Sequence, residues 1–371
     1  MTAFAPTPER LPALDGLRGA MAMCVALYHY AMWFGFQGLG TPGNTLLAAF
    51  GLYSVQGFFV LSGVCFHHLY RNARFGGRDL LAFHLKRYFR IAPLYYVSVL
   101  LCLALGLAVG PAPSMRVLLE NFSLTFGFFH PNHALIVGGW SIGLECIFYV
   151  ALPLMVLAGR LPYGLWVLFA GLLLVAVRAD SQMRATDYAQ RFHAYVVVGN
   201  HAFLFVIGAL LSELRRRCSS RAPAWLLPLV AVGIGAGVWL GCAPVRDHFA
   251  LVSGQARIFG VGLCAGLVAV AALTRPTSAR LAAAYGLLGE LSFGVYMLHR
   301  VAYASVAPFV ASWPAAWRCA AALCVATLLA RLSFRVVERP LLRLGQRLAE
   351  RVRDFGPTAT PTAVVEGAKA R

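Results

Sequence analysis

Long apolar stretches follow one another along almost the whole chain. A helix of about 20 residues spans the hydrocarbon core of a bilayer, and windows of that length identify ten predicted spans. The spans are residues 16–36, 46–69, 91–109, 140–158, 163–178, 193–213, 224–241, 254–273, 286–309 and 317–336. The pattern therefore predicts an all-α fold, a polytopic transmembrane helical bundle with about ten spans.

Basic residues gather on one side of this predicted bundle. With ten spans both termini share a side, and the loops on that side contain the arginine-rich runs at 71–90, 215–221 and 339–353. Short cytoplasmic loops carry an excess of Lys and Arg, so we expect an N-in and C-in topology. We divide the chain into an integral membrane domain, 1–340, and a basic cytoplasmic tail, 341–371, which is partly disordered after Phe355.

Composition agrees with the hydropathy pattern. The 371 residues are 60% hydrophobic and 12% charged, which is outside the range of soluble proteins. A formal charge of +18 suggests nucleic acid as a partner, but the placement of the arginines is that of the positive-inside rule. We therefore expect a multi-pass protein of the bacterial inner membrane that binds no nucleic acid. Its basic face suits an anionic co-substrate.

The cysteines and loop histidines give weaker signals. None of the nine cysteines forms a Cys-x-x-Cys pair, so the sequence predicts neither a disulfide framework nor a metal site. The long loop 110–139, expected on the outer side, has room for a short helix in its middle. Its group His130, Asn132 and His133 either anchors an interfacial segment or contacts a polar acceptor.

The first span carries two ionisable residues. Arg18 and His29 are eleven positions apart, so on a helix they share nearly one face and are separated by about 16 Å of rise. Ionisable groups at membrane depth usually face the bundle interior or a water-filled path. This spacing predicts a polar path through the bundle, although a single histidine in an apolar helix also occurs as a bridge between helices.

Other polar groups mark the ends and interiors of later spans. They are Ser62 in GFFVLSG, Lys86, Arg87 and Arg90 in HLKRYFRIAP, Trp140, Ser141 and Glu145 in WSIGLE, Tyr296 and His299 in LGELSFGVYMLHR, and Glu338 in VERP. Counting residues from the span ends places His29, Glu145 and His299 at a similar depth. Some of these residues also have a purely structural interpretation. Glu145 can form an interhelical hydrogen bond or ion pair, residues 84–90 can be an ordinary cytoplasmic loop, and Glu338 can belong to an ion-pair network.

Taken in this order, the segments resemble the acyltransferase 3 family, the membrane-integral O-acyltransferases that modify bacterial surface glycans and some small molecules. The resemblance covers residues 11–340. It implies a cytoplasmic acyl-CoA donor, transfer within the bundle, and a hydroxyl acceptor presented from the outer side. It also implies that His29 is the essential histidine, with Arg18 as its partner. Arg300-Val301 replaces the Pro or Trp-Pro that commonly follows the second histidine, which bears on the acceptor class.

Physical chemistry suggests a role for each candidate. We expect Arg18, Lys86, Arg87 and Arg90 to bind the phosphates of acyl-CoA, because guanidinium groups pair well with phosphate oxygens. His29 is the expected general base, and Glu145 the group that orients it. The candidates for contacting the substrate or the developing oxyanion are Ser62, Trp140, Ser141, Tyr296 and His299.

Several alternatives stay open on the sequence alone. We expect no tightly bound cofactor, acyl-CoA (acetyl-CoA) as co-substrate, and a polysaccharide or lipid-linked glycan as acceptor. The acceptor can instead be a hydroxylated small molecule, and transfer can pass through a covalent acyl-histidine. A different class of function, transport of a glycan or lipid, would use the same polar residues as the lining of a path.

Overall fold

The computed structural model describes residues 11–35, 42–73, 75–110, 112–183, 187–218, 222–223, 226–241 and 247–354. Within these ranges the regular structure is helical, and pairing of the β type is limited to one isolated bridge between Ala222 and Thr274. The predicted all-α fold is confirmed. The tail after Phe355, expected to be disordered, lies outside the described residues.

Seven helices of the described chain are long and apolar enough to cross a membrane. They are Asn44–Tyr70, Gly77–Ala104, Gly139–Ala158, Gly164–Gln182, Gly254–Leu273, Ala279–Phe309 and Ala315–Asp354. Each contains or overlaps one of the predicted spans. Two further predicted spans fall on α1 (Pro12–Trp33) and α10 (Leu226–Gly241). The total of ten spans and the side of the termini stay predictions.

The predicted span 193–213 is wrong as a single helix. The chain forms α8 (Tyr188–Val196), then a 3-10 turn, and then α9 (Ala202–Arg217). At the break, the buried Asn200 side chain donates to the carbonyl of Tyr195 at 3.0 Å, and the Arg257 guanidinium donates to the carbonyl of Asn200. These side chains satisfy backbone groups that a continuous helix would satisfy itself, which is how a membrane protein tolerates a broken helix.

Close helix packing depends on small residues. In α2 (Pro42–Tyr70), Gly63 faces Gly208 of α9, and a Cβ built on Gly208 would lie 2.1 Å from the carbonyl oxygen of Val60. A side chain at either glycine would force the two backbones apart. This is the small-residue packing expected where helices associate in lipid. It fixes α9 against α2, which carries Ser62.

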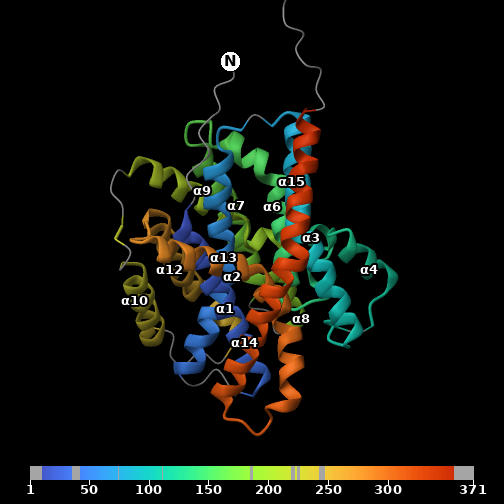
Figure 1. Cartoon of the computed structure of the whole chain (residues 1–371). Coiled ribbons are helices and arrows are strands. Elements are labelled where there is room, and N and C mark those ends of the chain that lie inside the picture. Colours follow the sequence, from blue (N-terminus) through green and yellow to red (C-terminus); the bar gives the residue numbers. More distant parts are fainter. Residues whose placement is uncertain are drawn as a thin grey trace, which may run out of the picture.

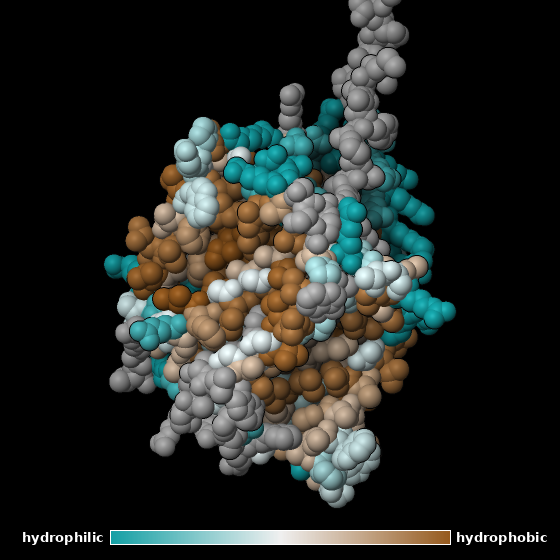
Figure 2. All heavy atoms as spheres, turned by 90° about the vertical axis from the view of Figure 1, so that its left-hand side faces the viewer, coloured by the Kyte–Doolittle hydropathy of each residue, from teal (hydrophilic) through white to brown (hydrophobic). Residues whose placement is uncertain are grey.

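One face of the molecule has an apolar middle. On the face shown in Figure 2, hydrophobic side chains cover the central zone and hydrophilic ones gather at the upper end. The helices on this side include α10 and α12 (Gly254–Leu273), where Val232 and Ile258 are 69% and 75% exposed. Large apolar side chains turned outward on adjacent helices are expected where the solvent is lipid. The protein is a multi-pass membrane protein.

A continuous rod closes the bundle. It consists of α14 (Ala315–Ser333), a π-helical turn (Phe334–Glu338) and α15 (Arg339–Asp354). Figure 1 shows α15, in red, running beside α3 (Gly77–Ala104). The remaining helices of the described chain are α4 (Met115–Phe122), α5 (Phe126–Phe129), α6 (Gly139–Ala158), α7 (Gly164–Gln182), α11 (His248–Leu251), α13 (Ala279–Val306) and the 3-10 turns Pro131–His133, Val198–Asn200 and Ala307–Phe309. The short helix expected within 110–139 is α4.

Candidate active site

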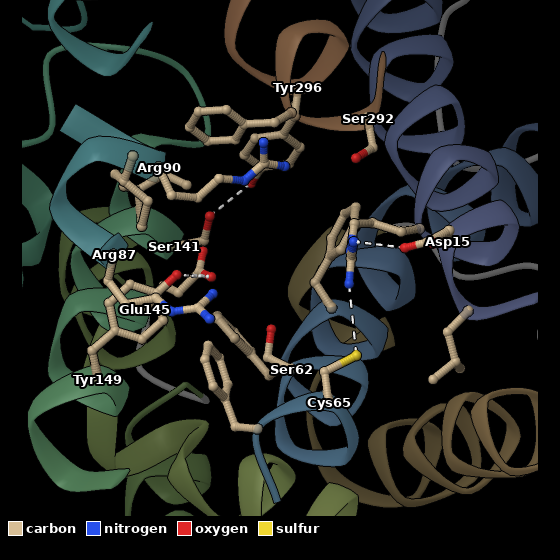
Figure 3. A pocket seen from close by; sticks show the side chains of 18 of the residues that line it. Asp15, Ser62, Cys65, Arg87, Arg90, Ser141, Glu145, Tyr149, Ser292 and Tyr296 are labelled. Carbon is tan, nitrogen blue, oxygen red and sulfur yellow. Dashed lines mark hydrogen bonds and ion pairs between the residues drawn. The ribbon is translucent and has the colours of Figure 1, made fainter. Parts of the chain in front are cut away.

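A cavity of about 530 Å³ lies between helices α1, α2, α3, α6 and α13, and we name it the Arg18 cavity. Its polar lining residues are Asp15, Arg18, Ser62, Cys65, His68, Arg87, Arg90, Ser141, Glu145, Tyr149, Ser292 and Tyr296. Figure 3 shows most of them pointing into one space from helices far apart in the sequence. Three arginines against two carboxylates make this lining net positive.

Arg18 is held at one wall of this cavity. Its guanidinium donates to Asp15 at 3.2 Å, one turn earlier on α1, and to the Cys65 sulfur of α2 at 3.7 Å. The Arg18 side chain is 28% exposed, so its charge is reachable from the cavity. The contact with Asp15 orients the guanidinium without burying it.

Arg87 and Glu145 lie on the opposite wall (Figure 3). The Arg87 guanidinium lies 4.7 Å from the centre of the Phe66 ring and donates to the Tyr70 hydroxyl at 3.3 Å. Its Nε atom is buried without a hydrogen-bond partner. Glu145 accepts a hydrogen bond from Tyr149, one turn later on α6. This wall thus contains a cation held by aromatic rings and a carboxylate held by Tyr149.

Arg90 connects the cavity to the π-helical turn. Its guanidinium lies 3.3 Å from a carboxylate oxygen of Glu338, which is 2% exposed. A π turn adds one residue to a helix and is often found at functional sites. Lys86, a predicted phosphate ligand, is not among the residues that line the Arg18 cavity. It precedes Arg87 by one position, which on α3 turns it about 100° away.

A second cavity, of about 240 Å³, contains His29 and is named the His29 cavity. Its lining is mostly aromatic and comes from α1, α2, α6, α8, α11 and α13. These residues include Tyr28, Trp140, Tyr188, Phe192, Tyr195, His248, Phe249 and Tyr296. Val55 and Tyr296 line both cavities, so the two spaces adjoin at these side chains.

His29 is positioned by ring stacking. Its imidazole is stacked with His299 and with Trp33, with centroid distances of 4.9 Å and 5.2 Å. Its Nδ1 atom is buried and makes no hydrogen bond of normal geometry, although the backbone of Val25 interacts with the ring. His29 lines the cavity, and Nδ1 is the ring nitrogen that is buried from solvent.

Tyr296 stands between the two cavities. Its hydroxyl lies 2.9 Å from the Ser141 hydroxyl, and both lie within hydrogen-bond distance of the Gly138 carbonyl oxygen, at 3.2 Å and 2.9 Å. Gly138 has a φ of +77°, and a Cβ there would lie 2.9 Å from the Tyr296 oxygen. A glycine is thus required for this cluster of two hydroxyls at the boundary.

The structure distributes the predicted site residues over both cavities. Ser62, Ser141 and Glu145 line the Arg18 cavity, and Trp140 lines the His29 cavity. The expected contact between Glu145 and His29 is not found among the interactions of the described residues, because Glu145 lies in the other cavity and binds Tyr149. His299 does lie beside His29, as its depth predicts, but it is fully buried and lines neither cavity described above.

Sequence reasoning missed five polar residues of the Arg18 cavity, Asp15, Cys65, His68, Tyr149 and Ser292. Asp15 was detectable, because a carboxylate three positions before Arg18 faces it on a helix. No role is predicted for Cys65, and nothing in its neighbourhood along the chain signals the contact with Arg18. Tyr149 follows Glu145 by four positions, a spacing that allows the observed hydrogen bond.

Comparison with known proteins decides the family. The profile of the acyltransferase 3 family, described as an acyltransferase domain, matches residues 11–334. This range is nearly the whole chain and includes all the residues that line the two cavities. The chain belongs to the acyltransferase 3 family. As a member of the acyltransferase 3 family, the protein is an acyltransferase, and the resemblance seen in the sequence motifs is confirmed.

A curated relative matches over a shorter length. "Protein 2 in picA locus" of Rhizobium radiobacter is 35% identical over 98 residues, which are 26% of this chain and 46% of that protein. The match thus spans just under half of the relative's own length. No solved structure matches this acyltransferase 3 chain.

Proposed function

We propose that the protein is an acyl-CoA-dependent O-acyltransferase of the bacterial inner membrane. It moves a short acyl group, for which we propose acetyl, onto a hydroxyl of a surface polysaccharide or lipid-linked glycan. One observation carries the proposal: the Arg18 cavity and the His29 cavity adjoin at Tyr296 and Val55. A donor entering one cavity and an acceptor entering the other would meet at this boundary.

The Arg18 cavity fits the donor. Arg18, Arg87 and Arg90 offer planar guanidinium groups that pair with phosphate oxygens. Apolar side chains such as Val55, which lines both cavities, and Phe58, which packs against Tyr296, suit the weakly polar pantetheine arm. In this arrangement the phosphates stay at the cytoplasmic mouth, and only the arm with its thioester enters the bundle.

His29 supplies the base. The acceptor oxygen attacks the thioester carbonyl carbon, and its proton passes to His29 Nε2. The carbon–sulfur bond then breaks, and the leaving CoA thiolate takes up that proton, which returns His29 to its neutral form. General-base catalysis of this kind is worth about 10²–10⁴ in rate. The hydroxyls of Tyr296 and Ser141 at the boundary are the groups we assign to the developing oxyanion. Glu145, beside Arg87, is assigned to the donor site.

The test measures CoA release and ester formation by the purified protein in lipid nanodiscs supplied with acetyl-CoA. We expect His29→Ala to abolish transfer while the thermal midpoint stays near that of the wild type. His84→Ala is the matched control, because His84 is a half-buried histidine of α3 that lines neither cavity, and it should retain activity. Undiminished turnover by His29→Ala would remove His29 from the mechanism.

A separate measurement tests each remaining alternative: an acyl-histidine intermediate, a small-molecule acceptor, and transport. Label from acetyl-CoA trapped on His29 without acceptor would indicate an acyl-histidine intermediate. Comparison of glycans and secreted products from cells with and without the gene identifies the acceptor, since the lost ester is either on a glycan or on a small molecule. Flux of a lipid-linked glycan in proteoliposomes without any acyl donor would support transport.

A further inference from the structure

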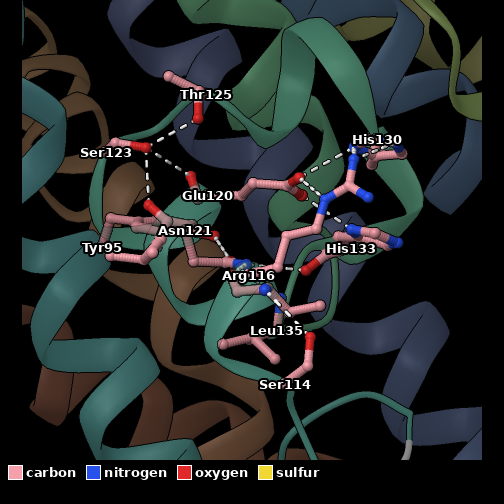
Figure 4. Close-up of polar contacts among 12 residues, drawn as sticks. Tyr95, Ser114, Arg116, Glu120, Asn121, Ser123, Thr125, His130, His133 and Leu135 are labelled. Carbon is pink, nitrogen blue, oxygen red and sulfur yellow. Dashed lines mark hydrogen bonds and ion pairs between the residues drawn. The ribbon is translucent and has the colours of Figure 1, made fainter.

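One carboxylate and two imidazole side chains lie close together outside both cavities, in the segment between α3 and α6. Glu120 is on α4, His130 follows α5, and His133 lies in the 3-10 turn (Figure 4). The Nδ1 atoms of His130 and His133 lie 3.0 Å and 2.8 Å from the two carboxylate oxygens of Glu120. Among the described residues, these three side chains are the group of His, Cys, Asp or Glu residues that lie close enough together to hold one metal ion.

The donor atoms suit a particular class of ion. One atom from each of the three side chains lies within 4.8 Å of the others. Zn²⁺ binds imidazole nitrogen and carboxylate oxygen at about 2.0–2.2 Å, so neighbouring donors of a tetrahedral site are about 3.3–3.5 Å apart. Small side-chain rotations separate the present donors to that distance. Two imidazoles and one carboxylate leave a fourth position for water or another ligand.

The backbone that carries the histidines is fixed independently of Glu120. Asn121, which is fully buried, donates to the carbonyls of His133 and Val117 at 2.9 Å and 2.8 Å. Its side-chain oxygen accepts from the Leu135 amide and the Tyr95 hydroxyl at 3.1 Å and 2.6 Å. Every hydrogen-bonding capacity of this amide is used. The spacing between α4 and the histidine segment is therefore set before any ligand binds.

Arg116 now provides the positive charge beside the carboxylate. Its Nε donates to Glu120 at 2.9 Å, and its terminal nitrogen lies 3.0 Å from Nε2 of His130. The Arg116 side chain is 65% exposed, so it can leave for solvent at little cost. If His130 binds a metal through Nδ1, its Nε2 carries the proton and cannot accept from Arg116. Arg116 and the metal ion thus compete for this place.

We propose that Glu120, His130 and His133 bind a divalent transition-metal ion of the Zn²⁺ class, with Arg116 as the competing cation. The 3-10 turn that contains His133 packs against α8, and α8 lines the His29 cavity through Tyr188. A bound ion cross-links α4 to this turn and stiffens the support of that wall. The site does not depend on the proposed acyl-CoA chemistry.

The experiment titrates full-length protein in detergent, after chelator treatment, with Zn²⁺ alone, and follows the thermal midpoint. We expect a saturable rise of several degrees, no response to Mg²⁺, and visible absorption bands with Co²⁺. The substitutions His130→Ala and His133→Ala should each abolish the rise. His193→Ala is the control, because His193 is an exposed histidine of α8 outside the group, and it should keep the full response.

A second variant separates a metal site from a plain ion-pair network. Arg116→Gln removes the competitor, so the zinc concentration at half-saturation should fall several-fold. A network without metal affinity would show no zinc response in either the wild type or Arg116→Gln, and that result overturns the proposal. An equal response in the wild type and in both histidine variants would place the zinc elsewhere and overturn it as well.

Discussion

The imidazole rings of His29 on α1 and His299 on α13 are stacked, with centroids 4.9 Å apart and 16° between their planes. Trp33 lies parallel to both rings, 5.2 Å from His29 and 5.6 Å from His299. The buried His299 ring is fixed in turn, because its Nδ1 donates to the Tyr296 carbonyl at 2.7 Å. The orientation of His29 therefore depends on a residue 270 positions away in the chain.

Replacing His299 should act on catalysis through this stack. We expect His299→Ala to lower kcat of acyl transfer by about 10²-fold, since small misplacements of a catalytic group have effects of that size. The KM for the donor should change little. His299→Phe keeps a ring against His29 and should recover most of the activity in steady-state assays. Equal losses in both variants would indicate that the imidazole nitrogens matter instead of the stacking.

Tyr296 should keep donor hydrolysis low. Tyr296→Ala removes the side chain shared by the two cavities, so water gains a route to the thioester. We expect CoA release without acceptor to rise while transfer to the acceptor falls. Tyr296→Phe keeps the ring but loses the hydroxyl beside Ser141, and should slow transfer without raising hydrolysis. The measurement is CoA release with and without acceptor, and unchanged hydrolysis in Tyr296→Ala would contradict the assignment.

Gly138 should tolerate no side chain. Its φ of +77° costs an L-residue about 1–2 kcal/mol. The added Cβ would also lie 2.9 Å from the Tyr296 oxygen. We expect Gly138→Ala to lower the thermal midpoint. Gly171→Ala is the matched control, because Gly171 lies inside α7 with open space around it, and alanine there should stabilise the helix by up to about 1 kcal/mol.

Substitutions of Arg90 and Glu338 should change stability and donor binding in different ways. Arg90→Met leaves the buried Glu338 carboxyl without its cation and should lower the free energy of unfolding, by less than the about 3–5 kcal/mol of a buried pair that must stay charged, because the carboxyl can take up a proton. The double variant Arg90→Met/Glu338→Leu removes both charges and should recover most of that stability. It should still show a raised KM for the acyl-CoA donor, because Arg90 is assigned to the phosphates. Additive stability losses in denaturant titrations would argue against a coupled pair.

Acid should weaken the loop that holds Glu120. Burial acts to raise the pKa of Glu120, but hydrogen bonds with His133 and Arg116 and the nearby imidazoles lower it below its ordinary value. A lowered folded-state pKa contributes stability above the unfolded pKa of about 4.3, and this is lost as pH falls through the folded value. The thermal midpoint of the wild type should exceed that of Glu120→Gln at neutral pH, and the difference should shrink below about pH 4. A constant difference across this range would contradict the shift.

The sequence predicts the helices and part of the site for clear physical reasons. Hydrophobic windows locate the spans, and the spacing of Arg18 and His29 along one helix follows from helix geometry. Counting residues from the span ends also brings His299 to the depth of His29. The same counting fails for Glu145, because depth along a helix does not say which of two adjoining cavities a side chain enters.

Contacts between distant segments escape such reasoning. Arg90 and Glu338 are 248 positions apart, and their pairing depends on the π turn and on the packing of α15 against α3. The meeting of Glu120 with His130 and His133 depends on the turns between α4 and the 3-10 helix, where Leu124 has a φ of 58°. Neither turn has a recognisable signature in the hydrophobic pattern.

The π-helical turn also constrains the number of residues that the chain must have between α14 and α15. One inserted residue rotates everything downstream by about 100°, so the face of α14 that packs on α13 and the face of α15 that packs on α3 are out of phase. Deleting a single position between Phe334 and Glu338 would restore an uninterrupted helix and swing the Glu338 carboxylate and the contact face of α15 away from α3. The length of this short segment is therefore as strongly constrained as its residue types.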